Sequence, residues 1–360
     1  MPKNPVMIPR PATLAQRVPW QQALSHAISD PRELLRRLGL DASLLTEMEH
    51  AHGLFRTRVP ESYLARIRHG DPFDPLLLQV LPQGAEASGH PSFVADPVGD
   101  GDAMAAQGLL HKYRHRVLLV TTGACAIHCR YCFRREFPYG AFSAARDWKP
   151  AVDYIRRHAD ITEVILSGGD PLTLPDRRLE ELLHGLEAIP HVTRLRIHSR
   201  LPIVLPERVD GGLLSWLGKG RLAHVLVLHA NHPRELEAPA DAALARLRST
   251  GVTLLNQSVL LAGVNDDIET LCRLQEACFS AGILPYYLHL LDRVRGVAHF
   301  EVAEARARAL HDGMRTRLPG YLLPRLVREI PGAPGKMPVE SIGAATPPTD
   351  RIEQATRSDA

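Results

Sequence analysis

The chain has 360 residues, 45% of them hydrophobic and 23% charged, which is ordinary usage for a globular protein and excludes disordered and fibrous classes. The net charge of +3 is too small to indicate a nucleic-acid-binding surface. The sequence contains neither an apolar run long enough for a transmembrane helix nor the hydrophobic core of a signal peptide. We therefore expect a cytoplasmic protein without a nucleic-acid or membrane partner.

The first hundred residues carry helical patterns separated by Pro and Gly. Residues 31–40, 41–53 and 59–70 have apolar side chains at helical spacing, with Asp41 as a possible N-cap and Gly70 at an end. Residues 71–103 are rich in Pro and Gly and predict an extended connector. We expect residues 1–100 to form a helical N-terminal extension with its connector.

From about residue 115 short apolar runs alternate with amphipathic stretches. The runs predict six strands, at residues 116–123, 163–170, 194–199, 224–230, 252–261 and 283–292. The stretches predict helices within 176–189, 206–218, 233–250 and 266–282. Continuously apolar strands alternating with helices indicate a parallel sheet covered by helices. We expect an α/β fold, a partial (β/α)6 barrel over 101–300, followed by a C-terminal segment over 301–340 and a polar tail over 341–360.

Three of the five cysteines follow the first predicted strand as Cys125, Cys129 and Cys132, a C-x3-C-x2-C pattern. A structural zinc site takes four protein ligands, whereas a centre held by three thiolates keeps one metal position open for a substrate or cofactor. One alternative is a Cys3His zinc site that uses His128 or a distant histidine, in a non-enzymatic binding protein. Another is three unrelated buried thiols. We expect Cys272 and Cys278, in a predicted helix, to be buried thiols.

The cysteine spacing at the end of the first strand resembles the signature of the radical S-adenosylmethionine superfamily, whose fold is a partial barrel. The resemblance implies a [4Fe–4S] cluster on the three thiolates, with S-adenosylmethionine on its fourth iron. An external one-electron reductant of the flavodoxin or ferredoxin type is also implied, and the cofactor supplies the hydrogen-abstracting radical. The turn after the second strand matches the glycine-rich motif that contacts S-adenosylmethionine, at Ser167, Gly168, Gly169 and Asp170.

Longer runs resemble the lysine 2,3-aminomutase family, over most of residues 90–340. These runs are 111–135, 200–209, 231–236, 256–266, 285–292 and 296–300. The resemblance implies pyridoxal 5′-phosphate bound by Lys336, one of only five lysines, whose amine can form a Schiff base. A phosphate-binding P-loop is excluded there, because Ile330 and Met337 replace its first Gly and its Ser/Thr.

Further roles follow from the same resemblance. It assigns Lys112, Tyr113 and Arg116 to pyridoxal 5′-phosphate, and His229 and Gln257 to the nucleoside of S-adenosylmethionine. It assigns Arg134 to the substrate carboxylate, and Asp292 and Glu329 to the substrate ε-ammonium. The alternatives are an ordinary Gly-Lys turn at Lys336, and surface acids paired with neighbouring arginines at Asp292 and Glu329.

The implied reaction moves the α-amino group of L-lysine to Cβ and gives β-lysine. Catabolic or biosynthetic aminomutases of the family make (S)-β-lysine and carry cysteines for zinc in a C-terminal extension. A second branch makes (R)-β-lysine, which a separate ligase attaches to elongation factor P. This sequence has no cysteine after Cys278, and Glu329 stands where the catabolic enzymes carry Asp. We therefore favour the branch that modifies elongation factor P.

Overall fold

The computed structural model of the protein describes residues 19–142, 144 and 147–339. The expectations for the extreme N-terminus and for the polar tail lie outside these residues. No helix within the described part of the chain combines the length and the apolar character that crossing a bilayer requires.

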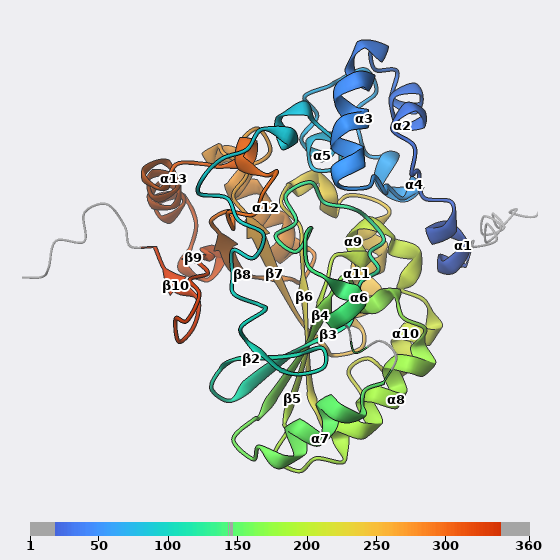
Figure 1. Ribbon diagram of the computed structural model, residues 1–360, viewed down its shortest axis with the longest axis vertical. Helices are drawn as coiled ribbons and strands as arrows, with labels where there is room; N and C mark the ends of the chain where they lie inside the picture. The colour runs from blue at the N-terminus through green and yellow to red at the C-terminus, as the bar shows by residue number, and fades with distance from the viewer. Residues whose placement is uncertain (1–18, 143, 145–146, 340–360) are drawn as a thin grey trace, which may run out of the picture.

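One sheet of ten strands runs through the molecule, with the strands side by side in chain order (Figure 1). Strands β3 to β9 are each parallel to their neighbours, while β1 and β2 at one edge and β10 at the other edge are antiparallel. The strands are β1 (Met104–Ala106), β2 (Leu109–Tyr113), β3 (Arg116–Thr122), β4 (Glu163–Gly168), β5 (Arg194–Ser199), β6 (Ala223–Leu228), β7 (Thr253–Val259), β8 (Leu284–His289), β9 (Arg325–Arg328) and β10 (Met337–Pro338).

The six strands predicted from the sequence are β3 to β8. Strand β9 is a seventh parallel strand that the sequence patterns do not predict, because its four residues, two of them terminal arginines, are too few for a recognisable apolar run. The radical S-adenosylmethionine fold expected above, a partial barrel with a helical N-terminal region, is confirmed in its α/β architecture.

Helices cover the outer face of the parallel strands and form the main core with them (Figure 1). In α8, Leu179, Leu182, Leu183 and Leu186 are all buried, at the spacing of one helix face. The helices of this part are α6 (Tyr139–Phe142), α7 (Lys149–Arg157), α8 (Asp176–Glu187), α9 (Leu201–Val204), α10 (Gly211–Trp216), α11 (Ala240–Arg248), α12 (Ile268–Ser280) and α13 (Glu304–Arg317). Short 3-10 turns add Pro171–Thr173, Pro206–Arg208, Pro233–Leu236, Ala298–Phe300 and Gly320–Leu322.

The N-terminal helices lie together at one end of the molecule (Figure 1). They are α1 (Trp20–Ser25), α2 (Pro31–Leu38), α3 (Leu45–Leu54), α4 (Glu61–Leu64) and α5 (Pro75–Leu78), with 3-10 turns at Ala42–Leu44 and Gly84–Ala87. As expected, the Asp41 side chain caps a helical turn, by accepting from Ser43 N at 2.7 Å.

Two expectations for this region are wrong. The helix expected over 59–70 ends at Leu64, and Arg68 N donates to the Asp74 side chain at 3.1 Å instead of to a helical carbonyl. The segment expected to be extended contains α5, because Pro75 occupies its first turn and the Asp74 carboxylate caps it.

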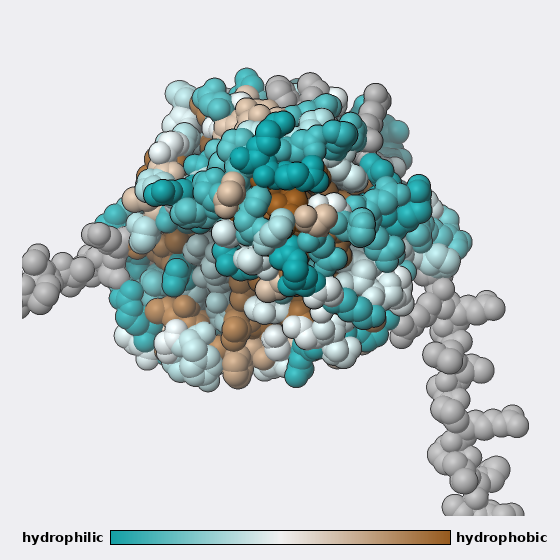
Figure 2. Space-filling model, turned by 90° about the horizontal axis from the view of Figure 1, so that it is seen from below, coloured by the Kyte–Doolittle hydropathy of each residue, from teal (hydrophilic) through white to brown (hydrophobic). Residues whose placement is uncertain are grey.

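Seen from below, the surface is a mixture of hydrophilic residues and small apolar areas (Figure 2).

Candidate functional site

The three clustered cysteines lie in the loop that follows β3, at the edge where the parallel strands end. All three thiols are free, and Cys132 N donates to Cys129 O at 3.0 Å, which tightens the loop. Burial, together with the neighbouring thiols, raises the pKa of Cys132 to about 11 and that of Cys125 well above its usual range. Three thiolates in one short, buried loop are stable only beside positive charge, such as the irons of a cluster would supply.

The zinc alternative finds no support in the geometry. Among the residues that the structure describes, no group of three His, Cys, Asp or Glu side chains could hold a single metal ion. The His128 side chain contacts the N-terminal region, with Nδ1 2.8 Å from Arg56 O and its ring centroid 5.3 Å from that of Phe55. Cys272 and Cys278 are both buried, as expected, and belong to different apolar clusters.

The glycine-rich turn after β4 packs directly on the cysteine loop. A Cβ at Gly169 would lie 2.3 Å from Ala124 O, and one at Gly168, whose φ is +123°, would lie 2.6 Å from Thr122 O. Gly169 N donates to Thr122 O at 2.7 Å. Both positions therefore need glycine, and the turn presents backbone rather than side chains beside the cysteines.

Asp170 ends this turn and is buried among hydrogen-bond donors. Its carboxylate accepts from Leu172 N, Ser199 Oγ, Arg200 N and Leu201 N at 2.8–3.0 Å. Burial raises its pKa against the effect of these hydrogen bonds. Asp170 therefore joins the loop after β4 to the segment after β5.

Polar side chains line the interior of the sheet near its carboxyl edge. Gln257 Nε2 lies 3.1 Å from Nε2 of His229, and the rings of His198 and His229 are 5.6 Å apart. Burial lowers the pKa of His229 to about 3 and the pKa values of His198 and His289 well below their usual range, so all three rings are neutral at pH 7.

Two of these histidines, His198 and His289, are not predicted as site residues from the sequence. Within the described part of the chain, the Nε2 atoms of both rings are buried and have no hydrogen-bond partner. Their only sequence signal is a polar residue near the end of an apolar strand. Unpartnered buried nitrogens facing a common interior fit a site whose ligand supplies the missing hydrogen bonds.

Lys336 lies beside the residues predicted to bind pyridoxal 5′-phosphate. Its ammonium pairs with the Glu329 carboxylate, which also accepts from the Tyr113 hydroxyl. Lys112 Nζ is 4.0 Å from Glu329 Oε1, and the Arg116 guanidinium stacks on the Tyr113 ring at 4.4 Å. The turn between β2 and β3 thus meets the loop between β9 and β10.

The alternative that Glu329 and Asp292 are surface acids paired with neighbouring arginines is wrong for Glu329. For Asp292 it finds no support. The Glu329 side chain is only 5% exposed and pairs with Lys336, whereas Arg328 pairs with Glu304. Arg293 pairs with Glu301 at 2.6 Å and not with Asp292. Burial raises the pKa of Asp292 to about 6, although Lys336 opposes that shift.

Arg134 is held by a carboxylate that the sequence patterns do not reveal. Its Nε donates to Asp100 Oδ2 at 2.7 Å, and its Nη1 donates to Ser167 Oγ at 3.0 Å. The second oxygen of Asp100 is 2.5 Å from Lys112 Nζ. Asp100 is 1% exposed and lies in the Pro/Gly-rich segment that we expected to be only a connector.

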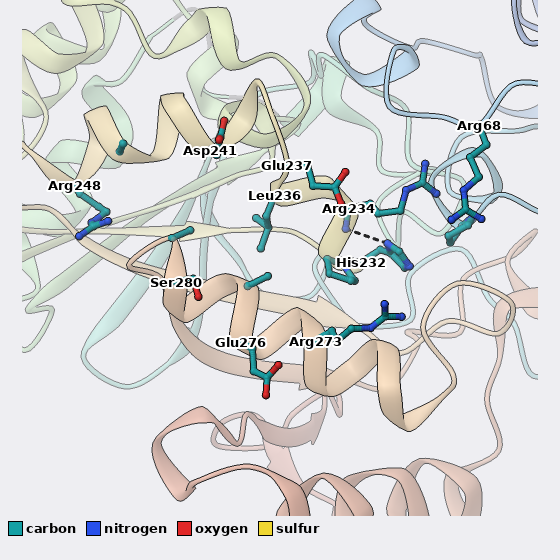
Figure 3. Close-up of a pocket in the computed structure, with 15 residues that line it drawn as sticks. Arg68, His232, Arg234, Leu236, Glu237, Asp241, Arg248, Arg273, Glu276 and Ser280 are labelled. Carbon is teal, nitrogen blue, oxygen red and sulfur yellow. Dashed lines mark hydrogen bonds between the residues drawn. The ribbon is translucent and has the colours of Figure 1, made fainter.

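The structure has a small cavity beside these residues and a larger cavity away from them. A cavity of 170 Å³ is lined by Lys112, Tyr113, Glu329 and the neighbouring loop residues. A larger one of 780 Å³ lies between α11, α12 and the 3-10 turn at Pro233–Leu236, and none of the predicted site residues lines it (Figure 3). The smaller cavity adjoins the cluster of ionisable groups and therefore belongs to the candidate site.

Comparisons with known proteins find relatives over most of the chain. Residues 119–211 match the model of the Radical SAM superfamily. The chain is 47% identical over 326 residues to L-lysine 2,3-aminomutase of Escherichia coli, covering 90% of this chain and 95% of that protein. Its identity to the L-lysine 2,3-aminomutase of Haemophilus influenzae is 44%, covering 92% of this chain and 98% of that protein.

More distant proteins match as well. L-lysine 2,3-aminomutase of Acetoanaerobium sticklandii is 34% identical, over 89% of this chain and 78% of that protein. Among solved structures, Streptococcus suis SuiB bound to S-adenosylmethionine aligns with a TM-score of 0.47 and 14% identity, over 61% of this chain and 51% of that chain.

Proposed function

Since the chain belongs to the L-lysine 2,3-aminomutase family of radical S-adenosylmethionine enzymes, we propose that it makes (R)-β-lysine from L-lysine for the modification of elongation factor P. As a member of this family it is an isomerase that uses a [4Fe–4S] cluster, S-adenosylmethionine and pyridoxal 5′-phosphate. The proposed partners are a flavodoxin- or ferredoxin-type reductant and, in function, elongation factor P with its lysyl ligase, all in the cytoplasm.

The pattern of sequence identities is one support for the proposal for the branch. Identity is 47% over 95% of the Escherichia coli relative, but only 34% over 78% of the Acetoanaerobium sticklandii relative. A second support is Glu329, which stands where the catabolic enzymes are expected to carry Asp.

We assign the cluster to Cys125, Cys129 and Cys132. Their soft thiolate sulfurs suit iron, and three ligands leave the fourth iron open. The neighbouring turn, with Ser167, Gly168, Gly169 and Asp170, supports the loop and offers backbone groups to S-adenosylmethionine, and His229 and Gln257 face the same interior. The two cofactors supply the radical that no protein side chain provides.

Pyridoxal 5′-phosphate is assigned to Lys336, with Tyr113, Arg116 and Lys112 around it. The cofactor supplies a π-system that stabilises an unpaired electron during nitrogen migration. Lys336 offers the amine, Tyr113 is positioned by its hydrogen bond to Glu329, and Arg116 and Lys112 bring positive charge suited to a phosphate. The unpartnered Nε2 atoms of His198 and His289 provide further hydrogen-bonding groups inside the same barrel.

The substrate is assigned to Arg134, Asp292 and Glu329 by charge. Arg134 suits the α-carboxylate of lysine, because a guanidinium fork binds carboxylates bidentately. The buried Glu329 carboxylate takes an ammonium group, that of Lys336, as its partner in the ligand-free protein. The ε-ammonium group of lysine can replace it, and Asp292 adds a second negative charge when ionised.

The test of the proposal is a chiral analysis of the product. Anaerobically reconstituted protein is incubated with L-lysine, S-adenosylmethionine and dithionite, and a reaction without S-adenosylmethionine is the control. We expect (R)-β-lysine, and we expect that adding the ligase and elongation factor P transfers this product to the factor. Formation of (S)-β-lysine would contradict the assignment to this branch and leave the family function intact.

A further inference from the structure

We propose that Arg200 is a positioning residue for the iron–sulfur cluster, and that its hydrogen bond to Cys129 raises the reduction potential of the cluster. The inference rests on the proposed function only in that Cys129 is taken as a cluster ligand. It also gives the N-terminal helices a role, because residues from that region hold Arg200 in place.

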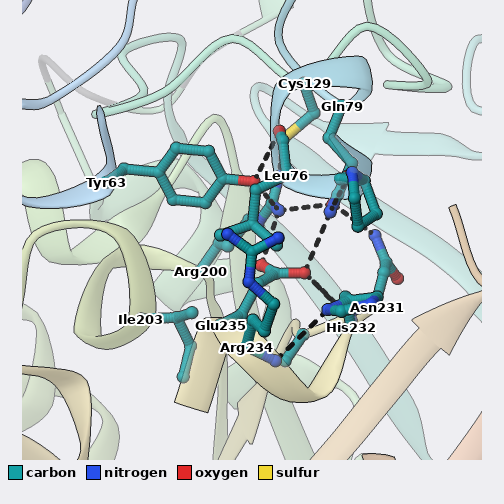
Figure 4. Close-up of polar contacts among 12 residues, drawn as sticks. Tyr63, Leu76, Gln79, Cys129, Arg200, Ile203, Asn231, His232, Arg234 and Glu235 are labelled. Atoms are coloured by element: carbon teal, nitrogen blue, oxygen red, sulfur yellow. Dashed lines mark hydrogen bonds and ion pairs between the residues drawn. The ribbon is translucent and has the colours of Figure 1, made fainter. Parts of the chain in front are cut away.

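The contact between Arg200 and Cys129 is direct. Arg200 Nη1 donates to Cys129 Sγ at 2.8 Å (Figure 4). Arg200 lies directly after β5 and is 5% exposed, so water does not screen its charge from the sulfur. Among the described hydrogen bonds, this is the only one that a side-chain cation makes to any of the three clustered cysteines.

Several groups fix the guanidinium in this position. Nη2 donates to Glu235 Oε2 at 2.7 Å and to Gln79 Oε1 at 2.6 Å, while Arg200 N donates to Asp170 Oδ2 at 2.8 Å. The Tyr63 ring lies 5.5 Å from the guanidinium carbon. The orientation of Arg200 is therefore set from several directions, as Figure 4 shows.

The partners of Arg200 are themselves held by the fold. Glu235 is fully buried, and its Oε1 accepts from Asn231 N at 2.9 Å and from Gln79 Nε2 at 3.1 Å. Gln79 follows α5 and Tyr63 lies in α4, so both come from the N-terminal region. The network thus joins that region, the loop after β6 and the cysteine loop.

The electrostatic consequence concerns a single electron. An external reductant of the flavodoxin or ferredoxin class gives one electron to the cluster, which becomes more negative by one charge, while Arg200 stays protonated and no bond is made or broken. A cation that donates to a ligand sulfur stabilises the reduced cluster more than the oxidised one. The contact therefore makes the cluster easier to reduce.

A purely structural role is the competing explanation, since Arg200 also pairs with Glu235 across the junction of the two regions. The decisive measurement is the midpoint potential of the cluster in the reconstituted holoenzyme, from a redox titration followed by electron paramagnetic resonance. The test variant is the double substitution Arg200→Gln/Glu235→Gln, which removes the cation without leaving Glu235 unpaired. The matched control is Arg208→Gln, because Arg208 is also buried and pairs with Asp176 at 2.6 Å, but has no hydrogen bond to a cysteine among the described residues.

We expect a more negative midpoint potential and an altered spectrum of the reduced cluster in the double variant, at unchanged iron content. Arg200→Lys, which keeps the charge, should restore part of the shift. The Arg208→Gln variant should lose stability and keep the wild-type potential. Gln79→Ala removes one acceptor of the guanidinium and should shift the midpoint potential in the same direction by a smaller amount. If the double variant binds no iron, the midpoint potential of Gln79→Ala is the deciding measurement.

Wild-type potentials in the loaded double variant, or in Gln79→Ala if the double variant binds no iron, would overturn the inference. The proposed function fails separately, if wild-type protein binds no iron–sulfur cluster or makes no β-lysine.

Discussion

Arg134 donates through Nε to Oδ2 of Asp100 at 2.7 Å, so the arginine expected to bind the substrate carboxylate already faces a carboxylate of its own chain. Asp100 also pairs with Lys112. One buried acid thus orients a residue assigned to the substrate and another assigned to pyridoxal 5′-phosphate.

Replacement of Asp100 by Asn should therefore disturb both stability and binding. Loss of one partner from a buried ion pair costs about 3–5 kcal/mol, and we expect a lower free energy of unfolding in urea and a higher KM for lysine. Asp160→Asn, at an exposed position outside the candidate site, is the control. Wild-type stability and KM in Asp100→Asn would mean that the contact has no role.

The same pair predicts a pH dependence of stability. Burial alone would raise the pKa of Asp100, but Arg134 and Lys112 outweigh it and lower the pKa below 3.8. The stabilisation is therefore present at pH values above the unfolded-state pKa and is lost as the pH falls through the lowered value. In urea titrations the deficit of Asp100→Asn should shrink in acid and be largest at neutral pH.

The ionised Asp292 carboxylate should lower the stability of the folded protein, in contrast to that of Asp100. The pKa of Asp292 is raised from 3.8 in the unfolded chain to about 6 in the folded protein, so ionising Asp292 in the folded protein costs free energy. Below the unfolded-state pKa the group is protonated in both states and this cost is absent. Above the folded-state pKa the cost is present in full. We expect Asp292→Asn to stabilise the ligand-free protein, by an amount that grows between about pH 4 and pH 6. Thermal unfolding at pH 5 and 7.5 measures this, and an equal gain at both values would contradict it.

Lys336→Ala should abolish covalent retention of pyridoxal 5′-phosphate and leave the iron content unchanged. The measurement is borohydride reduction followed by mass spectrometry of the labelled peptide. Lys219→Ala, at an exposed lysine outside the site, serves as the control and should retain the label at Lys336. A label on another lysine of the wild-type protein would refute the assignment.

Substitution of the cysteines should separate the cluster ligands from the other two thiols. Ala at Cys125, Cys129 or Cys132 should reduce bound iron and sulfide to a small fraction of the wild-type content. Cys278→Ala, at a fully buried thiol in α12, should keep the full content at a cost of about 1 kcal/mol of stability. Iron retained in a Cys132→Ala protein, or lost from Cys278→Ala, would contradict the assignment.

Local patterns in the sequence predicted the six strands β3 to β8 and the cysteine loop after the first of them. They succeeded because a buried strand needs a continuous apolar run and a cluster needs thiols within one loop. The short strand β9 and the helix α5 carry too weak a periodicity to be found in this way. The division into segments at residues 100, 300 and 340 stays a prediction.

The sequence by itself thus determined the fold class, the family and the chemistry that the clustered cysteines and Lys336 can support, because those features lie in contiguous residues. Only the tertiary structure decided which charges meet: Asp100 with Arg134, Glu329 with Lys336, and Arg200 with Cys129. Arg200 and Cys129 are 71 positions apart, and no periodicity links them. Such pairs depend on how strands and loops pack in space, where burial makes an unpaired charge costly and so selects its partner.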